Sequence, residues 1–429
     1  MDIQRTEIRL GLERMEPLMA ALSDPQDSLR FIQIAGTNGK GSVSAFLSEI
    51  LTRSGYRTGC YTSPAVENVC EQYLINGKPV SEDTLKRWMH RIRAVTRETG
   101  WENAEMPTAF ETETAAAFCI FKEADCDIVV LETGLGGRDD ATNIVRSTIV
   151  SVLTSITLDH TGFLGNTVRE IASVKAGIIK PGAAAVSTYR NREVSDVFTE
   201  RCEETGSELI FTEEVKPADI RMEGDRQFFS YKNWERMETG LRGRAQIENA
   251  ALVLETVGIL RSRGFELPEQ KVREGLLKTF LPCRLEKIAD DPPVFLDGAH
   301  NEAAVLRLRE YLRQEASSFW DIFIVGMFRD KDYMTVCRLM AGEAEWIITV
   351  QTEGNSRALD KEVLRDTFIA CGARAVCAES LREAAALALK KAREGGRRGR
   401  ITAFGSFSFL AALRKELELN IQGNGTERK

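Results

Sequence analysis

The residues best suited to chemistry form a glycine-rich segment near the start of the chain, GTNGKGS at residues 36–42. An apolar run at residues 31–35 precedes it and an amphipathic stretch at residues 43–53 follows it, which predicts a strand, a turn and a helix. Glycines let consecutive backbone N–H groups converge on an anion, and the helix start adds partial positive charge. Lys40 supplies a mobile cation for outer phosphates, and Ser42 supplies a hydroxyl for Mg²⁺. The segment therefore predicts a site for nucleotide phosphates.

The spacing of this segment departs from the common phosphate-loop pattern GxxxxGK[ST]. Ile34 stands where that pattern has its first glycine, and Gly41 separates Lys40 from Ser42. A glycine-rich turn without a ligand is the alternative interpretation. The order of strand, turn and helix favours the phosphate site.

Three further polar residues, Glu132, His160 and His300, lie at or just after the ends of apolar runs. Ligands commonly bind where the strands of an open α/β sheet end. Glu132 closes the run DIVVLE, and a carboxylate beside nucleotide phosphates is a natural ligand for Mg²⁺. A helix cap or a salt-bridge partner is the alternative role for Glu132. His160 and His300 each follow another run, whereas His90 lies in a charged stretch that is typical of a surface helix.

Lys175 lies in a predicted helix at residues 168–178, among mostly small or apolar neighbours. A lysine on a helix is ordinarily solvated. Burial would lower its pKa and make the free amine available for chemistry. The composition of the segment leaves both alternatives open.

The elements that position these residues alternate between short apolar runs and amphipathic stretches. This alternation predicts parallel sheets covered on both faces. Gly264, Pro268 and the segment at residues 280–282 separate two such series, so we predict two doubly wound α/β domains, over residues 1–280 and 281–429. Strands are expected at residues 31–35, 127–132, 149–155, 294–296, 322–325, 346–350 and 401–404, and helices of the second series at 302–313, 361–371 and 380–393.

The composition excludes several classes of protein. The 429 residues carry a formal net charge of −7, which argues against a general nucleic-acid binder. No stretch approaches the roughly 20 apolar residues of a membrane span. The nine cysteines are scattered without metal-ligand spacing, so reduced thiols are expected. We therefore expect a cytoplasmic monomer that binds small molecules, with no nucleic-acid or membrane partner.

The ordered set of motifs resembles the folylpolyglutamate synthase / dihydrofolate synthase family, within the Mur ligase superfamily. The resemblance runs along nearly the whole chain, and the ordered set is far more specific than any single motif. Its segments are LGLER at 10–14, GTNGKGS at 36–42, YTSP at 61–64, VLETGLGGR at 130–138, DATN at 140–143, LDHT at 158–161, KAGIIKPG at 175–182, PCR at 282–284, DGAHN at 297–301, GMFRDKD at 326–332 and GSF at 405–407.

The resemblance implies an ATP-dependent ligase with an N-terminal phosphate-loop ATPase domain, which contains a parallel sheet, and a C-terminal Rossmann-like α/β domain. It also implies a specific set of site residues. The ATP-contacting positions are Asn38, Gly39, Lys40, Gly41, Asn249, Arg284 and Asp297, with His300 near ATP and the incoming amino acid. The magnesium positions are Ser42, Ser63, Glu132 and His160, and Lys175 matches a position that is carbamylated in similar enzymes and then acts as a metal ligand. The positions near the pterin substrate are Thr108, Glu111, Asp139, Asp140 and Ala141.

The implied reaction begins with phosphorylation of a folate carboxylate by ATP. The amine of L-glutamate then attacks the acyl phosphate, while Lys40, Mg²⁺ and Arg284 offset the charge on the phosphoryl group. Lys175, Lys40, His300 and Asp297 are the expected catalytic residues. Tetrahydrofolate or its polyglutamates are the expected acyl substrates; the sequence leaves open whether dihydropteroate is accepted and whether K⁺ assists. There are two alternatives: a Mur-type ligase with another acyl substrate, and a phosphate-loop ATPase that acts as a switch.

Three departures from the family pattern bear on the substrate. The stretch AVENVCEQY at residues 65–73 replaces a histidine-leucine pair and an FNERI-like segment, with Gln72 in place of an arginine. Cys283 replaces a glycine before Arg284, and Glu302 replaces a common proline. The first departure lies in a loop associated with the folate, so altered pterin binding or specificity is expected.

Overall fold

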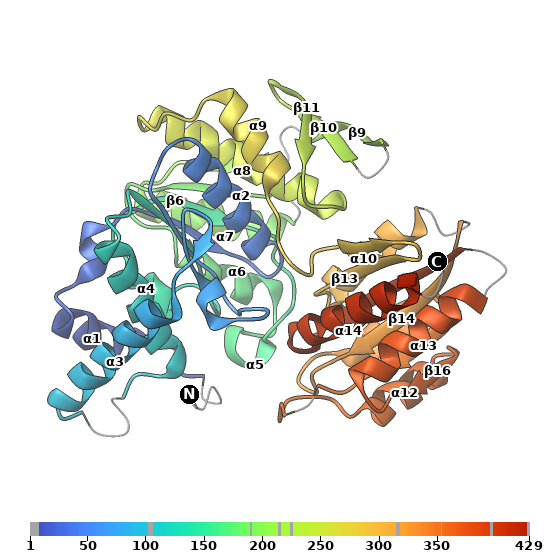
Figure 1. Cartoon of the computed structure of the whole chain (residues 1–429). Coiled ribbons are helices and arrows are strands. Elements are labelled where there is room, and N and C mark those ends of the chain that lie inside the picture. The colour runs from blue at the N-terminus through green and yellow to red at the C-terminus, as the bar shows by residue number, and fades with distance from the viewer. Residues whose placement is uncertain are drawn as a thin grey trace. The chain divides into compact units, whose positions relative to one another are not determined.

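The chain forms two compact units, each built on its own sheet (Figure 1). The computed structural model describes residues 8–101, 106–188, 191–212, 216–223, 226–314, 318–352, 354–394 and 398–426. The N-terminal unit comprises Met1–Gly240 and Gln246–Phe280, and the C-terminal unit comprises Leu241–Ala245 and Leu281–Lys429. The predicted α/β fold class, with largely parallel sheets, is confirmed.

The N-terminal unit is built on an eight-stranded, mainly parallel sheet. Its central strand β1 pairs in parallel with β5 on one side and β6 on the other. Every residue of β1 and β5 is buried, because helices cover both faces of the sheet. In spatial order the strands are β4 (Lys78–Pro79), β3 (Tyr73–Ile75), β2 (Thr58–Tyr61), β5 (Ile128–Glu132), β1 (Phe31–Ala35), β6 (Thr148–Leu153), β7 (Ala184–Ser187) and β8 (Leu209–Phe211).

Helix α2 (Lys40–Arg53) packs on strands β1, β2 and β5, and α9 (Glu269–Lys278) packs on α2. Helix α6 (Val168–Ala176) packs on α7 (Arg192–Thr205). A separate three-stranded antiparallel sheet is formed by β9 (Ala218–Glu223), β10 (Arg226–Tyr231) and β11 (Trp234–Thr239), and β11 contacts α9. The remaining elements are α1 (Met15–Ala21), η1 (Pro25–Ser28), η2 (Val69–Gln72), α3 (Glu82–Glu98), α4 (Ala109–Glu123), η3 (Ala141–Ile144), α5 (Thr161–Leu164) and α8 (Arg244–Ser262).

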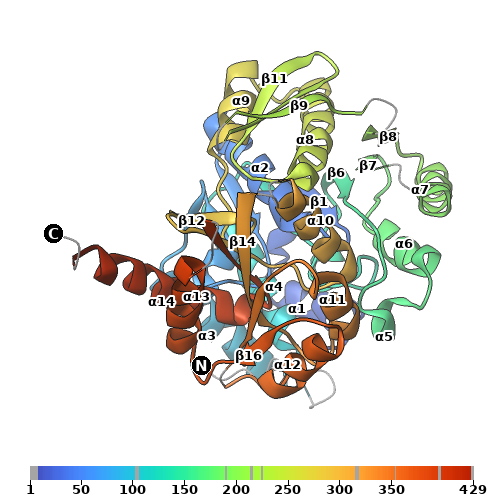
Figure 2. The same ribbon diagram turned by 90° about the vertical axis from the view of Figure 1, so that its right-hand side faces the viewer.

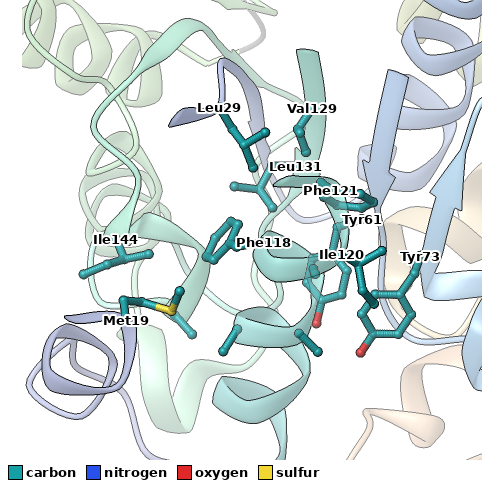
Figure 3. Packing of buried hydrophobic residues seen from close by; sticks show 14 of the residues in the cluster. Met19, Leu29, Tyr61, Tyr73, Phe118, Ile120, Phe121, Val129, Leu131 and Ile144 are labelled. Atoms are coloured by element: carbon teal, nitrogen blue, oxygen red, sulfur yellow. The ribbon is translucent and has the colours of Figure 1, made fainter. Parts of the chain in front are cut away.

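A large hydrophobic cluster joins α1, α3 and α4 to one face of the sheet. Figure 3 shows Phe118 of α4 between Met19 and the strand residue Leu131. The ring of Phe118 meets that of Phe31 edge to face at 5.7 Å, an arrangement that aromatic pairs favour. Small side chains at Ala115–Ala117 let α4 pack closely, and residues 111–121 of this helix are buried throughout.

The C-terminal unit is a six-stranded sheet with helices on both faces. Figure 2 shows β14 with α13 on one side and with α10 and α11 on the other. Strand β12 is antiparallel to β13, and the other pairings are parallel. The strands in spatial order are β12 (Glu286–Asp290), β13 (Pro293–Asp297), β17 (Arg398–Gly405), β14 (Phe319–Gly326), β15 (Trp346–Thr349) and β16 (Ala375–Cys377), and the helices are α10 (Glu302–Arg313), α11 (Tyr333–Met340), α12 (Lys361–Ala370), α13 (Leu381–Glu394) and α14 (Phe407–Thr426).

The strands and helices predicted from the sequence are present, with ends shifted by no more than three residues. One shift affects the site: α2 begins at Lys40 rather than at residue 43, so Lys40, Gly41 and Ser42 form its first turn. The strands not predicted from the sequence are β2, β3, β4, β7–β12 and β16. In β9, β11 and β12, charged residues interrupt the apolar pattern.

All nine cysteines are free thiols, and seven of them are buried. The expectation of unpaired, mostly buried cysteines is therefore confirmed. Among the described residues, no helix combines the length and the apolar character that crossing a membrane requires.

Candidate active site

The phosphate loop connects β1 to α2 at the carboxyl edge of the N-terminal sheet. Gly39 has a φ of 98°, in the left-handed region that glycine adopts readily, and α2 begins at the next residue. The loop is fixed to the segment after β6: Thr37 N donates to Ser155 O at 2.7 Å, and Thr37 Oγ1 donates to Thr157 O at 3.1 Å. The segment after β6 therefore holds the loop in place.

Asn249 of α8 approaches the phosphate loop from a distant part of the sequence. A β-carbon at Gly39 would lie 2.6 Å from Asn249 Oδ1, so the close approach requires glycine at this position. The Asn249 Nδ2 group donates to Gln246 Oε1 at 3.1 Å. The structure thus brings together the two sets of predicted ATP ligands in the N-terminal unit, the loop at residues 38–41 and Asn249.

Lys175 is buried on α6, with 4% of its surface exposed. Its Nζ donates to the carbonyl oxygen of Gly36 at 2.8 Å, and Lys40 Nζ donates to the same oxygen at 3.0 Å. Burial lowers the pKa of Lys175 to about 7, and the charge of Lys40 acts in the same direction. Of the two alternatives for Lys175, the structure therefore selects the buried lysine.

The predicted magnesium ligands Ser42 and Glu132 are buried at this edge of the sheet. Ser42 is 1% exposed, and its Oγ has no hydrogen-bond partner in the described part of the chain. Glu132 ends β5, where it pairs in register with Ile34 of β1, and it is 5% exposed. Ser63 follows the neighbouring strand β2. Buried hydroxyl and carboxylate oxygens at one edge of a sheet match the oxygen donors that Mg²⁺ prefers.

His160 differs from these residues because 38% of its side chain is exposed. It immediately precedes α5, as its N-cap, with a φ of 51°, and its Nε2 lies 3.9 Å from Asp159 Oδ1. Within the described ranges, no group of three or more His, Cys, Asp or Glu side chains is arranged to hold a metal. A cation here would depend on the serine hydroxyls and the Glu132 carboxylate, together with oxygens of the substrate or water.

In the C-terminal unit, Arg284 and Asp297 lie beside each other. Asp297 ends β13, and its carboxylate accepts hydrogen bonds from Leu285 N and Ala299 N, each at 2.9 Å. Burial raises the pKa of Asp297, and the charge of Arg284 opposes this shift. The preceding Cys283 has a φ of 55°, in the region that favours glycine, so the departure from the family's glycine places a side chain in a strained backbone conformation.

Phe407, at the start of α14, links Arg284 to His300. The Arg284 guanidinium lies 4.6 Å from the centre of the Phe407 ring, within the range of a cation–π interaction. His300 meets the same ring edge to face at 6.3 Å, and its Nδ1 lies 2.7 Å from Gly298 O. The three predicted residues of this unit, Arg284, Asp297 and His300, are therefore gathered at the carboxyl ends of β13 and β17.

Among the predicted folate residues, Thr108 and Glu111 form the capping box of α4. Thr108 Oγ1 accepts from Glu111 N at 3.2 Å, and Thr108 N donates to Glu111 Oε2 at 2.7 Å. The Glu111 carboxylate also binds Arg14, with Arg14 Nη2 at 2.9 Å from its Oε1. Through these contacts with Thr108 and Arg14, Glu111 orders the start of α4.

The other predicted folate residues are Asp139 and Asp140, in the loop that leads into η3, and Ala141, the first residue of η3. Asp140 is buried and accepts hydrogen bonds from Leu135 N at 2.7 Å and Thr142 N at 3.0 Å. Burial raises the pKa of Asp140, and these hydrogen bonds oppose the shift. Asp139 pairs with Arg138 on the surface.

This loop packs directly against the turn of α6 that carries Lys175. Arg138 N donates to Val174 O at 2.8 Å, and a β-carbon at Gly137 would lie 2.8 Å from Lys175 Cα. Only glycine permits this approach. The predicted folate loop and the phosphate loop therefore both contact the segment that carries Lys175.

Comparison with known proteins identifies the family. Residues 34–257 match the model of the Mur ligase middle domain, and residues 283–407 match that of the Mur ligase, glutamate ligase domain. The dihydrofolate synthase/folylpolyglutamate synthase of Bacillus subtilis is 36% identical over 345 residues, which cover 77% of this chain and 78% of the relative. The chain belongs to the folylpolyglutamate synthase and dihydrofolate synthase family.

Solved structures of this family share the fold. The Mycobacterium tuberculosis folylpolyglutamate synthase complexed with ADP and AMPPCP has a TM-score of 0.88 at 29% identity, covering 95% of this chain and 96% of its own. Escherichia coli FolC in complex with DHPP and ADP has a TM-score of 0.84 at 27% identity, covering 98% and 96%. Like the members of its family, the chain is an ATP-dependent ligase.

Three contacts of this folylpolyglutamate synthase family member were not predicted from the sequence. The quoted motif GSF contains Phe407, yet no role for its ring was predicted. For Thr37, the sequence predicted a place in the phosphate loop but not its hydrogen bonds to the segment after β6. Arg14 stood in the motif LGLER, but its pairing with Glu111 joins residues 97 positions apart, which no local pattern reveals.

Proposed function

We propose that this ligase adds L-glutamate to tetrahydrofolate and its polyglutamates, with ATP as the phosphoryl donor. The observation that carries the proposal is the packing of the loop at residues 137–141 against the turn that carries Lys175. Formation of an acyl phosphate needs the substrate carboxylate beside the nucleotide phosphates. The relatives named folylpolyglutamate and dihydrofolate synthase support a folate as that substrate.

In this proposal the residues of the N-terminal unit hold and activate ATP. The backbone at residues 38–41 and the Lys40 ammonium bind its phosphates, and Asn249 contacts the nucleotide from α8. Ser42, Ser63, Glu132 and His160 would hold Mg²⁺, and Lys175 would join them as a carbamate. When bound, Mg²⁺ offsets the charge of the phosphoryl group.

The transfer of glutamate follows in two steps. The folate carboxylate oxygen attacks the γ-phosphorus of ATP, which releases ADP and leaves an acyl phosphate. The glutamate amine then attacks the acyl carbon, an amide bond forms, and phosphate leaves. Arg284, Asp297 and His300 are the residues of the C-terminal unit proposed to contact ATP and the incoming amino acid.

The proposal is tested by mass spectrometry of the reaction products. Purified protein with ATP, Mg²⁺, L-glutamate and tetrahydrofolate should release ADP and a folate one glutamate heavier. Lys40→Ala should lose this product, whereas Lys122→Ala, which alters an exposed lysine on α4, should retain it. Release of ADP without a heavier folate would refute the proposal.

Two parallel reactions resolve the finer points of the proposal. Replacing tetrahydrofolate with dihydropteroate shows whether the enzyme also makes dihydrofolate. Replacing potassium salts with sodium salts shows whether K⁺ raises the rate. Neither reaction affects the test of folylglutamate formation itself.

A further inference from the structure

Three segments that are far apart in sequence meet at the proposed folate site. They are the N-terminal segment at residues 10–14, the first turn of α4 at residues 108–111, and the loop at residues 134–141. Gly11 N donates to Asp139 O at 2.8 Å, which ties the first segment to the third. A β-carbon at Gly134 would lie 2.3 Å from the Phe110 ring, so the second segment also packs closely on the third.

A buried ion pair ties the first segment to the second. Arg14 Nε lies 3.1 and 3.2 Å from the two carboxylate oxygens of Glu111, and Arg14 Nη2 lies 2.9 Å from Oε1. Arg14 is 8% exposed and Glu111 is 2% exposed. Bidentate arginine–carboxylate pairs of this kind fix the relative orientation of the two side chains in addition to pairing their charges.

The remaining donors of Arg14 organise its own segment. Its Nη1 donates to Glu13 Oε1 at 2.9 Å, and its Nη2 donates to Arg9 O at 3.1 Å. On the other side of the pair, Glu111 Oε2 accepts from Thr108 N. Arg14 therefore connects the backbone before α1 to the backbone at the start of α4 through a single guanidinium group.

We propose that Arg14 is a positioning residue for the folate, which acts through Glu111 to hold the first turn of α4 against the loop at residues 134–141. This inference rests on the proposed folate substrate. Removing one partner of a buried pair leaves an uncompensated charge, which drives the local structure to rearrange. The start of α4 would then shift relative to Asp139 and Gly134, while the phosphate loop, which Arg14 does not contact, would keep its geometry.

The test is a kinetic comparison of Arg14→Met, Arg14→Lys and Glu111→Gln with the wild type. Arg14→Met and Glu111→Gln should raise KM for tetrahydrofolate by about tenfold or more, because small misplacements of a binding surface cost that much. KM for ATP should stay within about twofold of the wild type. Arg14→Lys keeps the positive charge, so its KM for tetrahydrofolate should rise less than that of Arg14→Met.

A matched control separates positioning from general stability. Arg400 on β17 and Asp321 on β14 form a similar buried pair in the C-terminal unit, with Arg400 Nε at 2.6 Å from Asp321 Oδ1 and Nη2 at 3.0 Å from Oδ2. Arg400→Met should lower the thermal midpoint without raising KM for tetrahydrofolate selectively. If Arg14→Met does not fold, Arg14→Lys and Glu111→Gln decide the question.

The outcomes distinguish this inference from the proposed function. An unchanged KM for tetrahydrofolate in folded variants would overturn the positioning role alone, as would an equal rise in KM for ATP. A wild-type enzyme that makes no folylglutamate would overturn the proposed function and the inference that rests on it. A selective rise in KM that Arg14→Lys partly reverses would support the inference.

Discussion

The side chains of Lys40 and Lys175 donate to one oxygen atom, the carbonyl of Gly36, at 3.0 and 2.8 Å. Burial disfavours the charge on Lys175 and lowers its pKa, and repulsion from the nearby Lys40 ammonium acts in the same direction. The two lysines therefore differ in their proposed roles. Lys40 keeps its side chain at the loop proposed to bind phosphate, and Lys175 presents an amine that is readily deprotonated. A neutral amine is the form that reacts with CO₂ to give a carbamate.

Lys175→Ala should lose activity by at least about a hundredfold, because the proposed carbamate can no longer form. Acetate should restore part of the activity by supplying a carboxylate in the vacated space. Steady-state rates with and without acetate measure both effects. Lys180→Met removes a partly buried lysine from the same stretch of chain and should show no response to acetate; wild-type activity in Lys175→Ala would refute the carbamate role.

His160→Ala should raise the Mg²⁺ concentration needed for half-maximal activity, since the proposed site loses a ligand while its buried oxygens at Ser42 and Glu132 remain. A Mg²⁺ titration of the initial rate measures the shift. His90→Ala, on the exposed surface of α3, is the control and should titrate like the wild type. If both variants titrate alike, His160 is not part of the metal site.

Lys180 should make stability rise with pH. Burial, with smaller contributions from Arg201 and Arg146, lowers its pKa from 10.5 to about 8. Between these values the unfolded chain holds a proton that the folded chain has released, so the free energy of unfolding increases as pH rises. Between pH 8 and pH 10.5, the free energy of unfolding of the wild type should rise by up to about 3 kcal/mol relative to that of Lys180→Met.

Urea unfolding at several pH values measures this difference. Lys122→Met serves as the control, because its side chain is exposed at the end of α4. A constant difference between the wild type and Lys180→Met across this pH range would contradict the prediction.

Glu302→Pro should leave the free energy of unfolding within about 0.5 kcal/mol of the wild type, because proline suits the first position of a helix. Glu302 holds that position in α10, and the preceding Asn301 has extended backbone, which a following proline requires. Ala304→Pro should instead cost about 2 kcal/mol or more, since Ala304 N donates to Asn301 Oδ1 at 3.0 Å. Chemical denaturation compares the two; equal losses would show that the helix start is misassigned.

The local sequence determined the elements and the kind of chemistry. Hydrophobic runs and glycine placement follow from backbone preferences over a few residues, so the strand, turn and helix around residues 36–42 were predictable from that stretch alone. The family could also be identified from the sequence, because each motif is a contiguous stretch of residues and the order of the motifs along the chain is specific.

Only the tertiary structure decided which residues meet. The burial of Lys175, the approach of Asn249 to Gly39 and the pair of Arg14 with Glu111 all join distant segments. Parallel strands with crossover helices bring the carboxyl ends of β1, β5 and β6 to one edge, and packing on that edge sets which side chains lose water. Burial is a property of the assembled fold, and therefore the sequence left both alternatives for Lys175 open.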